Sequence, residues 1–243
     1  MTNWRIENGY RDVEPGNSMQ MKNDLMLYRF LSGSALKIIA VVSMTIDHIA
    51  YYILDQQLGM DDSWLYETMR CVGRLAFPIF AFLIVEGYHH TRHIGRYMLA
   101  LLVTAIVAEI PWQLLGNTDS HNVVFTLLLG LVVVFLIDHI HDALWLMLLE
   151  TALFSAIATM LNTDYTWHGI CLMVVFYLFR KHRGLTLLFG FPLLMEYGIV
   201  GSAIGLAVPL MYSGRRGFVK GCWLKYLFYI YYPLHLMVLW LLK

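Results

Sequence analysis

Nine apolar stretches, most of them about as long as a membrane-spanning helix, constrain what this chain can fold into. They cover residues 35–54, 71–88, 97–115, 122–138, 143–161, 166–180, 184–197, 198–213 and 223–242. A helix needs about 20 apolar residues to cross the hydrocarbon core of a bilayer. Only 14% of the 243 residues are charged, which is too few to cover the surface of a soluble domain. The sequence therefore predicts an all-α, polytopic transmembrane helix bundle of about nine helices, within a range of about eight to ten.

Three places within these stretches predict irregular helices. The seventh and eighth stretches are short, and the segments Gly190-Phe191-Pro192 and Glu196-Tyr197-Gly198 favour a tilted, re-entrant or broken pair. Inside the second stretch, Pro78 removes one backbone hydrogen bond. We expect a kink at Phe77-Pro78.

Lys and Arg side chains concentrate in alternate loops between the stretches. The basic loops are 89–96, 180–183 and 214–225, whereas the loops at 55–70, 116–121, 162–165 and 195–197 carry almost only acidic charge. Short cytoplasmic loops of membrane proteins are the ones enriched in Lys and Arg. The distribution predicts a cytoplasmic N-terminus, with residues 1–34 as a polar cytoplasmic extension and residues 35–243 as the transmembrane domain.

The total charge excludes one class of partner and the cysteines indicate no metal. Lys and Arg number 17, as do Asp and Glu, so the formal net charge is zero and gives no general attraction to nucleic acid. Membrane lipid is an expected partner, and nucleic acid is not. Cys71, Cys171 and Cys222 lack metal-ligand spacing. The histidines of segment 89–93 are expected at the membrane interface, so no metal site is predicted.

Many polar side chains fall inside the apolar stretches, where a charge needs a partner or a cavity. These residues are Lys37, Asp47 and His48 in the first stretch, Arg74 and Glu86 in the second, Glu109 in the third, and, further along, Asn122, Thr126, His168, Glu196 and His235, with Asp164 in the loop just before the sixth stretch. A membrane scaffold rarely tolerates so many. Their number predicts a functional site in the interior of the bundle.

Helical geometry relates several of these residues. Lys37 and His48 are eleven positions apart, which puts them on one face and about 16 Å apart along the axis at about 1.5 Å per residue. The second helix runs the opposite way, so we expect two ion pairs, Asp47–Arg74 and Lys37–Glu86. Histidine is the commonest general base near neutral pH. A hydrogen bond between helices remains an alternative role for His48.

Short segments spread over residues 36–242 resemble the TraX family, which is named for a conjugation protein associated with N-terminal acetylation of pilin subunits. They are LKIIAVVSMTIDHIA (36–50), GRLAFPIFAFLIVEGY (73–88), EIPW (109–112), NVVFTLLLG (122–130), DYTWHGI (164–170), SGRRG (213–217) and KYLFYIYYPLHL (225–236). The spacing from Lys37 to His48 is also similar to the basic-residue-to-histidine spacing in the first helix of membrane acyltransferases that O-acetylate cell-surface glycans. Unlike those larger enzymes, this chain is shorter, and we expect it to lack an appended extracytoplasmic domain.

The resemblance implies an acetyltransferase that uses cytoplasmic acetyl-coenzyme A. His48 is then the general base, with Asp47, Glu109 or Asp164 orienting its ring and Arg74 or Asn122 stabilising the oxyanion. The expected coenzyme-binding residues are Lys37, Glu86, Arg92, Arg96, Arg180, Lys181, Arg215 and Arg216. Guanidinium groups suit phosphate, although the preference of basic residues for the cytoplasmic side also explains these positions.

The resemblance leaves the acceptor, the chemical route and the class of function open. The acceptor is an exported peptide N-terminus, a glycan or a lipid-linked sugar. The expected location is the bacterial cytoplasmic membrane, which the protein crosses several times. Direct transfer and a transient acyl-histidine both fit. A proton-coupled transporter would use buried carboxylates and histidines as a relay. A non-catalytic membrane component of a conjugation or secretion system would not need Lys37 and His48.

Overall fold

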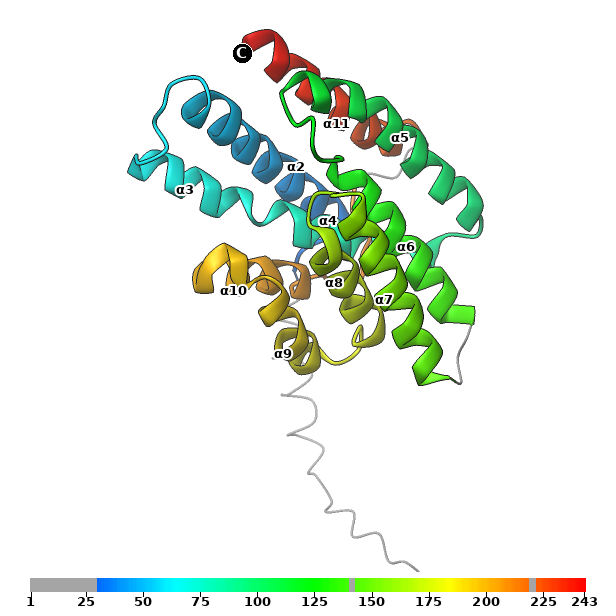
Figure 1. Cartoon of the computed structure of the whole chain (residues 1–243). Coiled ribbons are helices and arrows are strands. Elements are labelled where there is room, and N and C mark those ends of the chain that lie inside the picture. Colours follow the sequence, from blue (N-terminus) through cyan, green and yellow to red (C-terminus); the bar gives the residue numbers. More distant parts are fainter. Residues whose placement is uncertain (1–29, 140–142, 219–221) are drawn as a thin grey trace, which may run out of the picture.

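The computed structural model describes residues 30–139, 143–218 and 222–243, and it describes only the backbone of residues 222–225 (Figure 1). Most of the predicted cytoplasmic extension, residues 1–29, lies outside this part. The helices are α2 (Gly33–Ile49), α3 (Trp64–Gly73), α4 (Ala76–His90), α5 (Ile94–Leu114), α6 (Val123–His139), α7 (Leu144–Met160), α8 (Thr166–Leu178), α9 (Arg183–Leu193), α10 (Gly198–Leu210) and α11 (Cys222–Leu242). A π-helical segment, Ala50–Asp55, extends α2, and a 3₁₀ turn, Met195–Tyr197, precedes α10.

The predicted all-α transmembrane helix bundle is confirmed. Within the described residues, the helical segments Gly33–Asp55, Trp64–His90 and Ile94–Leu114 are each long and apolar enough to cross a membrane. Shorter apolar helices follow, and these residues form no β-strand, only two isolated bridges. The chain is thus a membrane protein.

The predicted break in the seventh and eighth stretches is also confirmed. Helices α9 and α10 meet at a bend of 69° and together form one further candidate span, either broken or re-entrant. Gly198 at the bend has a φ of 72°, a conformation that glycine adopts without steric cost.

The second span starts earlier and breaks earlier than the sequence predicts. It begins at Trp64, where the Ser63 side chain accepts a hydrogen bond from the Tyr66 amide as an N-cap. The helix is interrupted between Gly73 and Ala76 rather than at Pro78, which lies in the first turn of α4. Pro is tolerated there because the first-turn amides have no partner within the helix. The Ser43 hydroxyl donates to the carbonyls of Val72 and Gly73, so α2 supports the end of α3.

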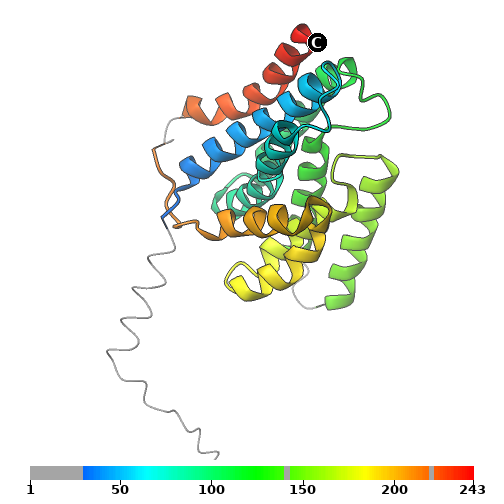
Figure 2. The ribbon, with the colours of Figure 1, turned by 90° about the vertical axis from the view of Figure 1, so that its left-hand side faces the viewer.

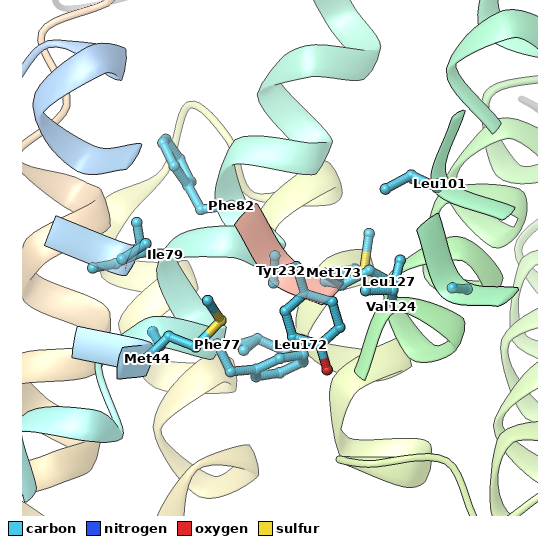
Figure 3. Close-up of a cluster of buried hydrophobic side chains, with 14 of the residues drawn as sticks. Met44, Phe77, Ile79, Phe82, Leu101, Val124, Leu127, Leu172, Met173 and Tyr232 are labelled. Atoms are coloured by element: carbon cyan, nitrogen blue, oxygen red, sulfur yellow. The ribbon is translucent and has the colours of Figure 1, made fainter. Parts of the chain in front are cut away.

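Helices α4 and α8 occupy the middle of the bundle. Helix α8 packs against α4, α6, α7 and α9, while α4 also packs against α2 and α10. Helix α5 lies between α6 and α11, and α11 comes close to the backbone of α2 at only a few positions (Figures 1 and 2). Buried side chains from seven helices, among them Met44, Phe77, Leu101, Leu172 and Tyr232, fill the centre (Figure 3).

Contacts between helix ends define two ends of the bundle. At the end that carries Arg180, Arg215 and Arg216, which we call the basic end, the start of α2 meets residues 211–217. At the opposite end, the Lys243 ammonium after α11 donates to Gln56 after α2 and to the Leu115 carbonyl after α5. The basic loops therefore gather at one end, as their alternation along the sequence predicts.

Candidate active site

Helices α2 and α11 meet through a row of polar and aromatic side chains, which we call the α2–α11 seam. Starting from the basic end, the Lys37 ammonium lies 5.4 Å from the centre of the Phe228 ring. The Thr45 hydroxyl lies 2.7 Å from the Tyr231 hydroxyl. One turn deeper, His48 Nδ1 lies 2.8 Å from His235 Nε2. Lys37 and His48 share one face of α2, as predicted, and that face is turned towards α11.

The two histidines form a tightly ordered pair at the deep part of the seam. Their rings are nearly parallel, with centroids 5.0 Å apart and an angle of 5° between planes. The Tyr231 ring stacks on His235 with centroids 5.3 Å apart, and Nδ1 of His235 lies 3.1 Å from the Tyr231 carbonyl oxygen. His235 is only 7% exposed. The imidazole of His48 is therefore held by a second imidazole.

The π-helical segment Ala50–Asp55, which follows His48, forms the end of the seam that is farther from the basic end. It carries Tyr52, whose ring meets the His48 ring edge-on with centroids 5.8 Å apart. The Asn117 side chain donates to the Tyr52 hydroxyl over 2.6 Å. Segments of π-helix occur frequently at functional sites because they shift side chains out of the regular helical register.

Asp47 points to the other side of α2 and pairs with Arg70 instead of the predicted Arg74. Arg70 Nη1 lies 2.7 Å from Asp47 Oδ2. Arg74 lies one turn further along and stacks over the Tyr197 ring at 4.7 Å, within electrostatic reach of Asp47. The prediction of an Asp47–Arg74 pair was wrong because it placed the start of the second helix at residue 71. Since Asp47 is held by Arg70, it does not orient His48.

Asp164 adds a second carboxyl group to this ionic cluster of Asp47, Arg70 and Arg74. It belongs to the loop between α7 and α8, in which Asn162, Tyr165 and Thr166 all have positive φ values. The Thr126 hydroxyl donates to the Asp164 carbonyl, and the Asp164 amide donates to the His121 carbonyl. Removal from water, and then the nearby Asp47 carboxylate, raise the pKa of Asp164 to about 7.

Glu109 does not reach His48, which corrects its predicted role in orienting the imidazole. Its carboxylate accepts hydrogen bonds from Gln113, His121 and Asn122 over 2.7–2.8 Å at the side-chain atoms. The second amide hydrogen of Asn122 goes to the Ala105 carbonyl. The Asn122 amide is thus fully used within the protein, which removes the predicted oxyanion role of this residue.

Glu86 pairs with Arg180 rather than with Lys37, so the second predicted ion pair was wrong too. The contact is bidentate, with Nε to Oε1 at 2.5 Å and Nη2 to Oε2 at 3.0 Å. Glu86 is 6% exposed, and a buried carboxylate of this kind needs such a partner. Its partner lies 94 positions away, two residues after the end of α8, a helix whose position the spacing within one hairpin does not reveal.

The basic end brings Lys37 next to the segment Ser213–Gly217. The Arg215 and Arg216 carbonyls accept hydrogen bonds from the Gly33 and Ser34 amides. The side chain of Arg216 comes within electrostatic reach of Lys37. Within residues 30–139, 143–218 and 222–243, neither cation has a carboxylate within ion-pair distance. Like charges held together in this way favour an anion between them.

The remaining predicted coenzyme contacts are exposed at the loops of the basic end. Arg92 and Arg96 flank the start of α5, and Lys181 follows α8. The structure brings Lys37, Arg215 and Arg216 to one place and assigns Arg180 to Glu86. In the described part of the chain, no group of three or more His, Cys, Asp or Glu side chains is arranged to hold a metal ion.

Sequence reasoning missed Arg70, Tyr231 and the partnership of His235 with His48. A signal for two of them exists, because Arg70 lies one turn before Arg74 and Tyr231 lies one turn before His235. In each pair, the missed residue lies on the same helical face as a residue that was already recognised as an intramembrane polar residue.

The chain is similar in sequence to known proteins. The family model described as "TraX protein" matches residues 32–243. A curated protein of Dichelobacter nodosus, named "Probable fimbrial assembly protein FimC, serogroup H1", is 28% identical over 239 residues, covering 86% of this chain and 94% of that protein. No solved structure matches significantly. Because the family model covers the α2–α11 seam, the ionic cluster and the basic end together, the chain belongs to the TraX family.

Proposed function

We propose that this protein is a membrane acetyltransferase that takes an acetyl group from acetyl-coenzyme A at the basic end and passes it to an acceptor near His48. The observation that carries the proposal is the α2–α11 seam, in which Lys37 at the basic end and His48 in the interior share one lined face. This arrangement suits an acyl donor whose anionic end lies at Lys37 and whose long arm extends along the seam to His48.

The anionic part of the donor is recognised by Lys37 and Arg216, with Arg215 beside them. These cations have no carboxylate partner among the described residues. Phosphate groups of coenzyme A supply the missing negative charge. Arg180 contributes less in this proposal, because two of its donors are bound to Glu86.

His48 acts as the general base. It removes the proton of the acceptor amine or hydroxyl while the acceptor forms its bond to the acetyl carbon and the carbon–sulfur bond breaks. The proton then leaves His48 for the thiolate of coenzyme A. A positioned base of this kind contributes about 10²–10⁴-fold to a rate. The acceptor is an exported peptide N-terminus or a glycan that arrives from the opposite end of the bundle, in a bacterial cytoplasmic membrane with the basic end inside.

Calorimetric titration of the detergent-purified protein with acetyl-coenzyme A tests the donor site. We expect saturable binding that is weakened about tenfold by Lys37→Ala or Arg216→Ala, each removing one charged contact, and further weakened by salt. Lys243→Ala removes an equal charge at the opposite end and serves as the matched control. His48→Ala should bind the donor but lose the release of free thiol. A folded protein that does not bind the donor contradicts the proposal.

The name of the Dichelobacter nodosus relative favours a second candidate, a non-catalytic membrane component of fimbrial assembly. Under this alternative the polar seam has a structural role only. Complementation of a deletion strain that assembles surface appendages separates the two. If Lys37→Ala and His48→Ala proteins restore both assembly and the modification state of the appendage subunit, the structural role is correct and the enzyme proposal fails.

A further inference from the structure

We infer that His235 is a positioning residue that fixes the tautomer of His48 and makes His48 Nε2 the basic atom of the site. The inference deepens the proposed acetyl transfer and rests on it for its function, although the hydrogen-bond order itself is independent of any activity. The hydrogen-bond order is set by the backbone carbonyl of Tyr231 in α11.

The Tyr231 carbonyl oxygen can only accept a hydrogen bond. Because His235 Nδ1 lies 3.1 Å from it, Nδ1 has to carry the hydrogen. His235 is 7% exposed, and no carboxylate of the described residues lies within ion-pair distance of it. A buried imidazolium without a partner is strongly disfavoured. His235 is therefore neutral, and its Nε2 is an unprotonated acceptor.

The next contact transmits this choice to His48. His235 Nε2 and His48 Nδ1 are 2.8 Å apart, so one hydrogen lies between them. Since Nε2 of His235 has none, the hydrogen belongs to His48 Nδ1. A neutral His48 then has its lone pair on Nε2, the nitrogen on the far side of the ring from His235. In general, the hydrogen bond made by one ring nitrogen decides which nitrogen is protonated.

The same chain of contacts also prepares His48 for the protonated state. When Nε2 takes a proton from the acceptor, Nδ1 keeps its hydrogen and continues to donate to His235. The ring does not have to turn, because the His48 and His235 rings already lie parallel, and His235 is itself held by the ring and the carbonyl of Tyr231. An imidazole thus does here what a carboxylate does in many other general-base sites, without adding a charge to the membrane interior.

Nitrogen-15 NMR of the histidine-labelled full-length protein in nanodiscs tests the tautomer directly. We expect both His48 and His235 to be protonated at Nδ1 and free at Nε2. His235→Gln keeps an acceptor oxygen for His48 Nδ1 and should preserve the tautomer, whereas His235→Leu should shift His48 to the Nε2-protonated form. Tyr231→Phe keeps the backbone carbonyl and the ring stack, and should leave the His48 signal unchanged. A wild-type His48 that is protonated at Nε2 overturns the inference.

Release of free thiol from acetyl-coenzyme A gives the second readout. We expect His235→Leu to lower the maximal rate about 10–100-fold with little change in donor affinity, and His235→Gln to recover most of it. If the tautomer is as inferred but no variant or wild type releases thiol with peptide or glycan acceptors, the acetyltransferase proposal fails alone. If thiol is released but His235→Leu matches the wild type, the positioning role fails alone.

Discussion

The carboxylate of Asp47 on α2 lies directly against the bare Cα of Gly73, where a Cβ atom would overlap the Asp47 side chain. This close approach lets Arg70, on the same face of α3, reach Asp47 Oδ2 at 2.7 Å. The close packing of α2 against α3 therefore depends on the absence of a side chain at residue 73.

Gly73→Ala should destabilise the protein by about 1–3 kcal/mol, the usual penalty for overpacking an interior contact. The added methyl group must displace Asp47 and lengthen its contact with Arg70. Thermal unfolding in detergent measures the effect. Gly95→Ala is the matched control, since a Cβ there meets nothing within 4 Å, and it should be neutral or slightly stabilising. Equal melting temperatures for the two variants would contradict the packing argument.

The revised partner of Asp47 can be tested by double-mutant cycles. The coupling free energy between Asp47→Asn and Arg70→Gln should be about 1–2 kcal/mol, discounted because both side chains retain some exposure. The same cycle with Arg74→Gln should give a smaller value, since Arg74 is stacked on Tyr197. Chemical unfolding of the four proteins of each cycle yields both numbers. A larger coupling to Arg74 would restore the pairing predicted from the sequence.

Two buried tyrosines should respond in opposite ways to loss of the hydroxyl group. The Tyr232 hydroxyl is buried and has no hydrogen-bond partner among the described residues (Figure 3). Tyr232→Phe should therefore be neutral or stabilise the fold by about 1 kcal/mol, because an unsatisfied polar group is removed. Tyr52→Phe loses the bond from Asn117 and should destabilise. Melting temperatures of both variants check the pair, and a clear loss in Tyr232→Phe would reveal a partner for its hydroxyl.

Asp164 makes the stability of the protein depend on pH. Its pKa is raised to about 7 in the folded state, against about 3.9 for an unperturbed Asp. Between these values the folded state holds more protons than the unfolded state, so stability is highest at the acidic side and falls as the pH rises toward about 7.

The measurement is the change in melting temperature between about pH 5 and about pH 8, taken as the difference between wild type and variant. Asp164→Asn should flatten the dependence, because an amide resembles the protonated acid at all pH values. Asp61→Asn, which alters an exposed loop carboxyl group, should follow the wild type. A variant at Asp164 that keeps the full wild-type dependence would show that another group is responsible.

Most helix positions could be read from the sequence, although the start and the break of the second span could not, and neither could the side-chain partners between helices. Apolar length and Gly or Pro positions determine where a span starts, ends or breaks, and these are local properties. Partners depend on helix rotation and on which helices become neighbours. Asp47 was assigned to Arg74 because the second span was expected to begin at residue 71, which left Arg70 outside it. His48 and His235 are 187 positions apart, and no spacing rule connects them.

The first turn of α2 has a further consequence for how the protein is made. The amides of Gly33 and Ser34 donate hydrogen bonds to the carbonyls of Arg215 and Arg216, each 182 positions later in the chain. Helices α2 to α10 leave the ribosome before that partner segment exists. The proposed donor site at the basic end is therefore assembled only when synthesis is almost complete, so a stalled or truncated chain would insert its helices without forming it.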